Sequence, residues 1–168
     1  MTGVQTCALP ISLKVRRAQP GAQAGLAQKR ASPLASTLGV HVMASSFFAD
    51  TVSFAPVDGV LTVAFSESAD GSNRYLLLQR QEHETEQDKR LGLVGDYVEY
   101  IDQARATYKG VKLVNLQRKS ATILFETAAV PILKESELNI SFELADSDFK
   151  LLQLALNKIL GASRVLVV

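Results

Sequence analysis

The sequence of 168 residues contains no tryptophan, one cysteine and five prolines. A single cysteine excludes a disulfide scaffold, and the low glycine and proline contents exclude collagen. No apolar run reaches the roughly 18 residues of a membrane-spanning helix. With 47% hydrophobic and 21% charged residues, the chain is neither wholly disordered nor a coiled coil. It is long enough to fold around one core.

Acidic residues are absent from residues 1–46, whose five basic residues are Lys14, Arg16, Arg17, Lys29 and Arg30. From residue 47 onward, 13 basic and 17 acidic residues give a net charge of −4, and all eleven aromatic residues lie there too. A segment without aromatic residues that is rich in Ala, Gln, Ser, Gly and Pro can bury little surface. We therefore expect residues 1–46 to form a basic arm without stable structure and residues 47–168 to form a single domain.

The first twelve residues, MTGVQTCALPIS, resemble the conceptual translation of a short-read sequencing adapter. We exclude them, and with them Cys7, from the interpretation of fold and function. Residues 13–42 are then expected to be upstream DNA read in frame with a false start, and Met43 is the candidate true start. The competing interpretation of this basic, acid-free arm is a targeting peptide.

The pattern of the domain predicts several strands and one long helix. Leu61, Val63 and Phe65 alternate with polar or small residues, which predicts a strand after a hairpin turn at Asp58-Gly59. The run RYLLLQR at residues 74–80 is apolar on both faces, which predicts a central strand covered on both sides. Further strands are predicted at residues 51–57, 96–101, 111–117, 121–126 and 138–144.

The C-terminal region has the spacing of an amphipathic helix. Its apolar stripe is formed by Phe149, Leu152, Leu156 and Ile159. We expect Asp146 as the N-cap and Gly161 as the C-terminal cap. The polar run at residues 81–90 predicts a loop or a short solvated helix, and residues 127–133 allow another short helix. The fold class is therefore α+β: an antiparallel β-sheet of about six to seven strands with a C-terminal amphipathic helix packed on it.

Signatures of catalysis are missing from the sequence. There is no glycine-rich phosphate loop, no GxSxG and no HExxH. His41 lies in the arm, and His83 stands among glutamates in a run that predicts a solvated acidic loop rather than a metal site. Arg74 and Arg80 flank a strand, where they either bind an anion or close the strand ends. We expect no enzymatic activity and no cofactor.

Three tyrosines near the middle of the domain, Tyr97, Tyr100 and Tyr108, are candidates for partner recognition. Tyrosine offers a rigid apolar body together with a hydroxyl group, and acidic neighbours can steer a basic partner. The candidate contact residues are Asp96, Tyr97, Glu99 and Tyr108. Ordinary surface charge explains the acidic residues equally well. The net charge of −4 disfavours nucleic acid as a partner.

An ordered set of segments covers nearly the whole domain. It consists of VLTVAFSE at 60–67, YLLLQR at 75–80, Tyr97-Val98-Glu99, Tyr108-Lys109-Gly110-Val111 and ISFELADSDFKLLQLALNKILG at 140–161. From Phe48 to Gly161 the chain resembles the immunity protein 10 family of bacterial polymorphic-toxin systems. Lys109 stands where the resemblance leads us to expect glycine, which puts a positive φ angle at that position in question.

The resemblance implies a non-enzymatic α+β protein of the bacterial cytoplasm. Such a protein would bind a cognate toxin domain and neutralise it by occlusion, with no nucleic acid and no membrane as partner. The alternative is a module similar to the pleckstrin-homology fold that binds a peptide or a lipid. This alternative requires a basic pocket between the early strands.

Overall fold

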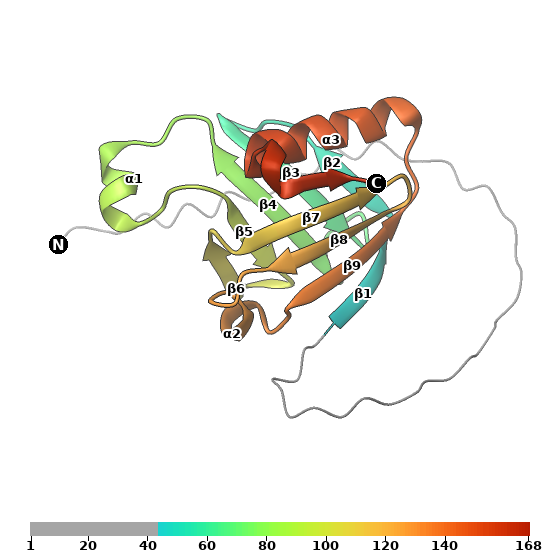
Figure 1. Ribbon diagram of the computed structural model, residues 1–168, viewed down its shortest axis with the longest axis horizontal. Coiled ribbons are helices and arrows are strands. Elements are labelled where there is room, and N and C mark those ends of the chain that lie inside the picture. The colour runs from blue at the N-terminus through green and yellow to red at the C-terminus, as the bar shows by residue number, and fades with distance from the viewer. Residues whose placement is uncertain (1–43) are drawn as a thin grey trace, which may run out of the picture.

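The computed structural model describes residues 44–168, which form two five-stranded β-sheets and a C-terminal helix (Figure 1). The strands of sheet A, in spatial order, are β1 (Ala44–Ala49), β9 (Glu137–Phe142), β8 (Ser120–Phe125), β7 (Val111–Gln117) and β10 (Val165–Val167). The strands of sheet B are β2 (Thr51–Phe54), β3 (Val60–Ser66), β4 (Tyr75–Gln81), β5 (Tyr97–Tyr100) and β6 (Asp102–Tyr108). The helices are α1 (Glu86–Leu91), α2 (Val130–Leu133), α3 (Asp146–Leu160) and a short 3₁₀ turn, η1 (Ala162–Arg164).

The predicted α+β class with a C-terminal helix is confirmed. The described residues divide their strands between two sheets, whereas the sequence pattern predicted about six to seven strands in one. Strands β1, β6 and β10 were not predicted, and β2 ends at Phe54 rather than at Val57, because these strands are short or lack apolar alternation. Strand β1 begins at Ala44, three residues before the predicted start of the domain. The adapter-like start, Cys7 and the candidate start Met43 lie outside the described residues.

Sheet A is antiparallel at its centre and parallel at both edges. β7 pairs with β8, and β8 with β9, in antiparallel register. The edge strands run parallel to their neighbours: Phe47 of β1 lies opposite Ile140, and Val165 of β10 lies opposite Val114. The two edges are therefore built from the first and the last strands of the described chain.

Sheet B is an antiparallel meander with β4 at its centre. The three consecutive leucines of β4, Leu76, Leu77 and Leu78, are all buried. Successive side chains of a strand point to opposite faces, so the strand is covered on both sides, as RYLLLQR predicted. Leu76 and Leu78 belong to the common core, while Leu77 lies on the opposite face of the sheet.

One core joins the inner faces of the two sheets and α3. The rings of Phe65 from sheet B and Phe142 from sheet A lie 5.7 Å apart. Helix α3 contacts β2, β3 and β4 of sheet B and also β10 of sheet A (Figure 1). Its stripe places Leu152 and Leu156 fully in the core, whereas Leu154 is exposed. The predicted amphipathic helix and its buried face are confirmed.

The ends of α3 differ in how well they were predicted. Gly161 is the C-cap, with a φ angle of +88°, and its N–H donates to the carbonyl of Asn157 at 2.9 Å, as expected. The N-cap is Ala145, so the assignment of Asp146 was wrong by one residue. The Asp146 carboxylate instead pairs with Arg118 at 2.7 Å, and it still lies in the first helical turn.

The connections follow their sequence signals. Helix α1 is the short solvated helix allowed by the polar run; it has no buried residue and starts with a capping box between Thr85 and Asp88. Lys109 has a φ angle of +55°, so the turn between β6 and β7 uses a left-handed residue even though it is not glycine. The next residue must be small, because a Cβ atom on Gly110 would lie 2.6 Å from Val98 Cγ1.

Candidate partner-binding face

The face of sheet B that points away from the core carries three neighbouring rows of side chains, with Val60 and Gln81 beyond them. The rows follow from the strand register: Thr51, Ser66 and Tyr75; then Ser53, Ala64, Leu77, Glu99 and Ala106; then Thr62, Gln79, Tyr97 and Tyr108. We call these twelve residues the tyrosine face. Glu99 is the single charged side chain among them, and none is Lys, Arg or His.

A carboxylate held by two phenols lies in the middle of this face. Glu99 is only 6% exposed, and its Oε1 and Oε2 atoms accept hydrogen bonds from the hydroxyls of Tyr75 at 2.5 Å and Tyr97 at 2.6 Å. Hydrogen bonds to an ionised acceptor are short and strong, and they offset the cost of burying the charge. The cluster therefore fixes both tyrosine rings on the surface of the sheet.

The phenols of this cluster stay protonated over a wide pH range. Burial raises the pKa of Tyr75 and Tyr97 well above the ordinary value, and the hydrogen bond to Glu99 raises it further. Both hydroxyls are therefore available as donors to Glu99. The ring of Tyr97 also meets that of Tyr108 edge to face, with centroids 5.3 Å apart. The aromatic surface is organised before any partner arrives.

The structure brings together three of the four candidate contact residues. Tyr97, Glu99 and Tyr108 share the tyrosine face, as the period of two along a strand predicts. Asp96 is set apart, because it is 2% exposed and its Oδ1 pairs with Arg164 Nη2 at 2.8 Å. A carboxylate that is buried and already paired within the chain is not an accessible contact, so its position is structural.

Two further residues near the tyrosine face, Tyr100 and Asp102, make contacts within the domain. Tyr100 is 1% exposed and points into the core, where the guanidinium of Arg105 lies 4.6 Å from its ring centroid. The Asp102 carboxylate accepts the backbone N–H of Ala104 at 2.8 Å. Sequence reasoning missed Tyr75 as a member of the site. Its position two residues before Leu77, on the same face of the strand, was the available signal.

A cavity of about 370 Å³ opens at one end of the tyrosine face. Strands β2, β3 and β4 form its floor, and the loop between β3 and β4 forms a wall. The lining residues are Thr51, Ala64, Ser66, Ala69, Asp70, Gly71, Tyr75 and Leu77. The face is therefore not flat: it has rigid aromatic rings at one end and a hollow at the other.

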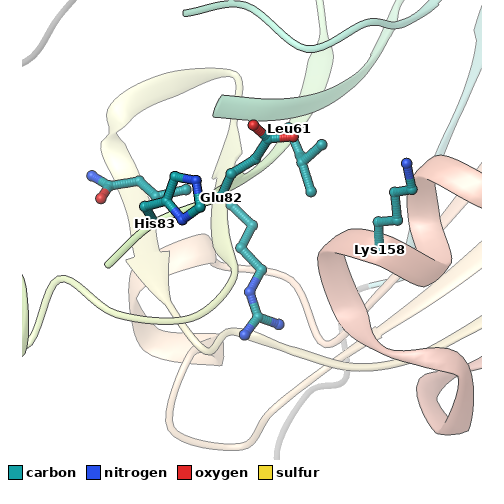
Figure 2. Close-up of a pocket in the computed structure, with 6 residues that line it drawn as sticks. Leu61, Glu82, His83 and Lys158 are labelled. Atoms are coloured by element: carbon teal, nitrogen blue, oxygen red, sulfur yellow. The ribbon is translucent and has the colours of Figure 1, made fainter. Parts of the chain in front are cut away.

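A second, more open cavity of about 470 Å³ lies between β3, β4 and the end of α3. Figure 2 shows His83 and Lys158 on opposite sides of this cavity, with Leu61 between them and Glu82 beside Leu61. Arg80 lines the cavity too, but its Nη1 donates to the carbonyl of Ile159 at 3.2 Å. Because the cations do not converge and a carboxylate stands among them, this is not the basic pocket that the peptide- or lipid-binding alternative requires.

Arg74 and the histidine region have ordinary structural surroundings. Arg74 pairs with Glu67 at 2.6 Å and donates to the carbonyl of Ser46 at 2.7 Å, which is the role of a strand-end arginine. Within residues 44–168, no group of three or more His, Cys, Asp or Glu side chains is placed to hold a metal ion. None of the helices in the described part of the chain is both long enough and apolar enough to cross a bilayer.

Comparison with protein families identifies the family to which this chain belongs. Residues 48–150 match the model of the family described as Immunity protein 10. This is more than half of the chain, so the chain belongs to the immunity protein 10 family. Membership implies a role as an immunity protein in a toxin system, with a toxin protein as partner, and such proteins are generally non-catalytic. No curated protein and no solved structure matches the chain significantly.

Proposed function

We propose that this protein binds the toxin domain of a cognate polymorphic toxin and neutralises it by occlusion, without catalysis, in the cytoplasm. The functional unit is the domain predicted at residues 47–168, extended to Ala44 by β1. The tyrosine face is its contact surface. The observation that carries this proposal is the Tyr75–Glu99–Tyr97 cluster, which holds two aromatic side chains in place on a sheet face.

Rigid tyrosines suit a binding surface for two physical reasons. Tyrosine presents a large contact area with few rotatable bonds, and it is enriched among the residues that dominate binding energy. Ordering a side chain at an interface costs about 0.5–1.5 kcal/mol. Glu99 holds Tyr75 and Tyr97, and Tyr97 packs on Tyr108. Because folding already orders these side chains, less of the ordering cost falls on toxin binding.

The connection between β4 and β5 carries more acidic than basic side chains; its basic residues are Lys89 and Arg90. It holds α1 and projects beyond the edge of the sheets (Figure 1). Its acidic residues are Glu82, Glu84, Glu86 and Asp88, and Leu91 and Leu93 are 62% and 38% exposed. The Glu84 carboxylate accepts the N–H of Gly95 at 2.9 Å, which ties the two ends of the connection together. A basic toxin surface would be attracted by this segment and by the net charge of the domain.

The outer face of sheet A offers the rival contact surface. It carries hydrogen-bonded polar side chains, such as Thr122, whose hydroxyl donates to Asn139 Oδ1 at 2.7 Å. Its large exposed apolar side chains lie at the two edges: Phe48 on β1 is 49% exposed, and Leu166 on β10 and the following Val168 are 47% and 81% exposed. Small numbers of exposed apolar residues are common on soluble proteins. We therefore place the toxin on sheet B and use sheet A to provide control variants.

Co-expression with the toxin domain encoded beside this gene tests the proposal. The wild-type chain should restore growth and bind the toxin domain, over an interface of about 800 Å² on each partner. Tyr97→Ala and Tyr108→Ala should each weaken binding at least about tenfold, while Phe48→Ala and Leu166→Ala should not. Thermal unfolding of each variant separates lost contact from lost fold. Absence of binding by the wild-type chain would refute the function, and sensitivity to Phe48→Ala alone would move the contact surface to sheet A.

A further inference from the structure

The cavity at the end of the tyrosine face combines an apolar floor with a polar rim. Ala64, Ala69 and Leu77 contribute aliphatic surface. Thr51, Ser66 and Tyr75 contribute hydroxyl oxygens, each of which can accept a hydrogen bond. At about 370 Å³ the cavity lies within the usual range for sites that take a small ligand group. An occupant would therefore be aliphatic along its length and polar at its end.

The charge in this cavity comes from Asp70. Hydrogen bonds from the N–H and the hydroxyl of Ser72, at 3.0 and 2.8 Å, both end on Asp70 Oδ1. The backbone bond from Ser72 is the main cause that lowers the pKa of Asp70 to about 2, so the carboxylate is ionised throughout the physiological range. The side chain is on the surface and not buried, so this charge can be approached by a partner.

Asp70 has no basic partner within the described residues. The nearest candidate in sequence, Arg74, pairs with Glu67 and donates to the carbonyl of Ser46. None of the residues that line the cavity is Lys, Arg or His, and the neighbouring tyrosine face has none either. The cavity thus carries an uncompensated negative charge at its rim, with the Glu99 carboxylate further along the same face.

The chemistry of the lining selects among cations. One carboxylate with scattered hydroxyls is a poor site for a divalent metal ion, which takes six or more oxygen ligands or near-ideal octahedral geometry. An arginine side chain fits better, because its methylene stem can cover Ala64 and Leu77 while its five N–H donors reach several acceptors in different directions. Arginine is also enriched among the residues that dominate binding energy at interfaces.

We propose that this cavity is the docking site for one arginine side chain of the toxin domain, with Asp70 pairing to its guanidinium group. The inference rests on the proposed function, since it names the group that the tyrosine face recognises. Tyr75 links the two parts, because it lines the cavity and also donates to Glu99. The arginine would be the central charged contact, with Tyr97 and Tyr108 packing beside it.

Direct titration of the full chain tests the cavity without the toxin. The probe is N-acetyl-arginine methylamide, followed by amide chemical shifts in nuclear magnetic resonance spectra. Saturable shifts should appear at Ala69, Asp70 and Gly71 and along Ala64 and Leu77, with millimolar affinity. The citrulline analogue, which keeps the shape of arginine but lacks its charge, should bind at least about tenfold more weakly. Equal shifts with both probes, or none at these residues, would overturn the proposal.

Two variants and one control make the result specific. Asp70→Asn keeps the Oδ1 acceptor for Ser72 but removes the charge, so it should lower the affinity for the arginine probe about tenfold while preserving the loop. Ala64→Leu should fill the cavity and abolish binding. Asp58→Asn, in the turn before β3, is the matched control and should change nothing. Binding by Asp70→Asn equal to that of the wild type would also overturn the proposal.

The same variants separate this inference from the function on which it rests. If the wild-type chain restores growth against its toxin but Asp70→Asn and Ala64→Leu restore it equally well, the cavity is refuted and the immunity function stands. If the arginine probe binds as described but the wild-type chain binds no adjacent toxin domain, the proposed function fails while the cavity remains a site for a guanidinium group.

Discussion

Asp96, directly before β5, pairs at 2.8 Å with Arg164, which lies 68 residues further along the chain. The same guanidinium group donates from Nε to the carbonyl of Leu160 at the end of α3, at 2.7 Å, and from Nη1 to the carbonyl of Val111 in β7, at 2.9 Å. One arginine therefore joins sheet B, sheet A and the end of α3. Asp96 is 2% exposed, so its charge depends on this partner.

Arg164→Ala should destabilise the protein more than any surface charge change. The substitution leaves the Asp96 carboxylate buried without its cation and removes hydrogen bonds to two carbonyl groups. Loss of one partner of a buried pair typically costs about 3–5 kcal/mol. Urea unfolding should show a decrease in free energy of this order. Lys119→Ala is the matched control: its pair with Glu143 spans 3.8 Å between side chains about three-quarters exposed, so the loss should stay below about 1 kcal/mol.

Alkaline pH should weaken the folded state through its tyrosines. Burial is the main cause that raises the pKa of Tyr75, Tyr97 and Tyr100 in the folded protein. In the unfolded chain these phenols ionise near a pKa of about 10. The folded state therefore keeps protons that the unfolded state has lost. This contribution to stability is fully present below about pH 10 and is lost as pH rises above it.

Glu99→Gln provides the test of this pH dependence. The amide removes the negative charge and one of the two acceptors, so the pKa of Tyr75 and Tyr97 should fall toward the ordinary value. Tyrosinate absorbance would then appear at lower pH than in the wild-type protein. The urea midpoint should also decline less steeply above about pH 10. Identical titration curves for the two proteins would show that the Glu99 cluster does not control these phenols.

Two leucines of α3 should respond very differently to the same substitution. Leu156→Ala removes a side chain that is fully buried in the common core, and such changes cost about 2–5 kcal/mol. Leu154→Ala removes one that is 57% exposed, and it should cost less than about 1 kcal/mol. The helix propensity change is the same at both positions, so the difference in unfolding free energy measures core packing. Similar values for both would mean that α3 does not contribute its stripe to the core.

Local periodicity explains which parts of this fold could be predicted. The strict alternation in β9 and the stripe of Phe149, Leu152, Leu156 and Ile159 depend on near neighbours, and both elements formed as expected. The shared face of Tyr97, Glu99 and Tyr108 followed from strand geometry in the same way. The parallel pairing of β1 with β9 joins segments about ninety residues apart, and no short-range pattern specifies it.

In the candidate site, too, local patterns could be predicted from the sequence but long-range contacts could not. Asp96 was expected to contact a partner because it is one of several acidic residues close together in the sequence, but its side chain is buried and paired with Arg164. The cavity beside Tyr75 also depends on long-range placement, since the loop carrying Asp70 stands against strands β2 and β4. A carboxylate in a turn, such as Asp70 before Gly71, has an obvious local role in that turn. The sequence alone does not show that Asp70 lacks a basic partner, because this depends on the pairing of Arg74 with Glu67.

The parallel edges of sheet A have a consequence for the order in which the sheet assembles. β10 pairs with β7 across about fifty residues of chain, and the N–H of Val168 donates to the carbonyl of Leu116 at 3.1 Å. Strands β7, β8 and β9 pair with near neighbours in sequence, so they can associate before β10 docks. Until it docks, the edge of β7 is open to pairing with a strand of another molecule.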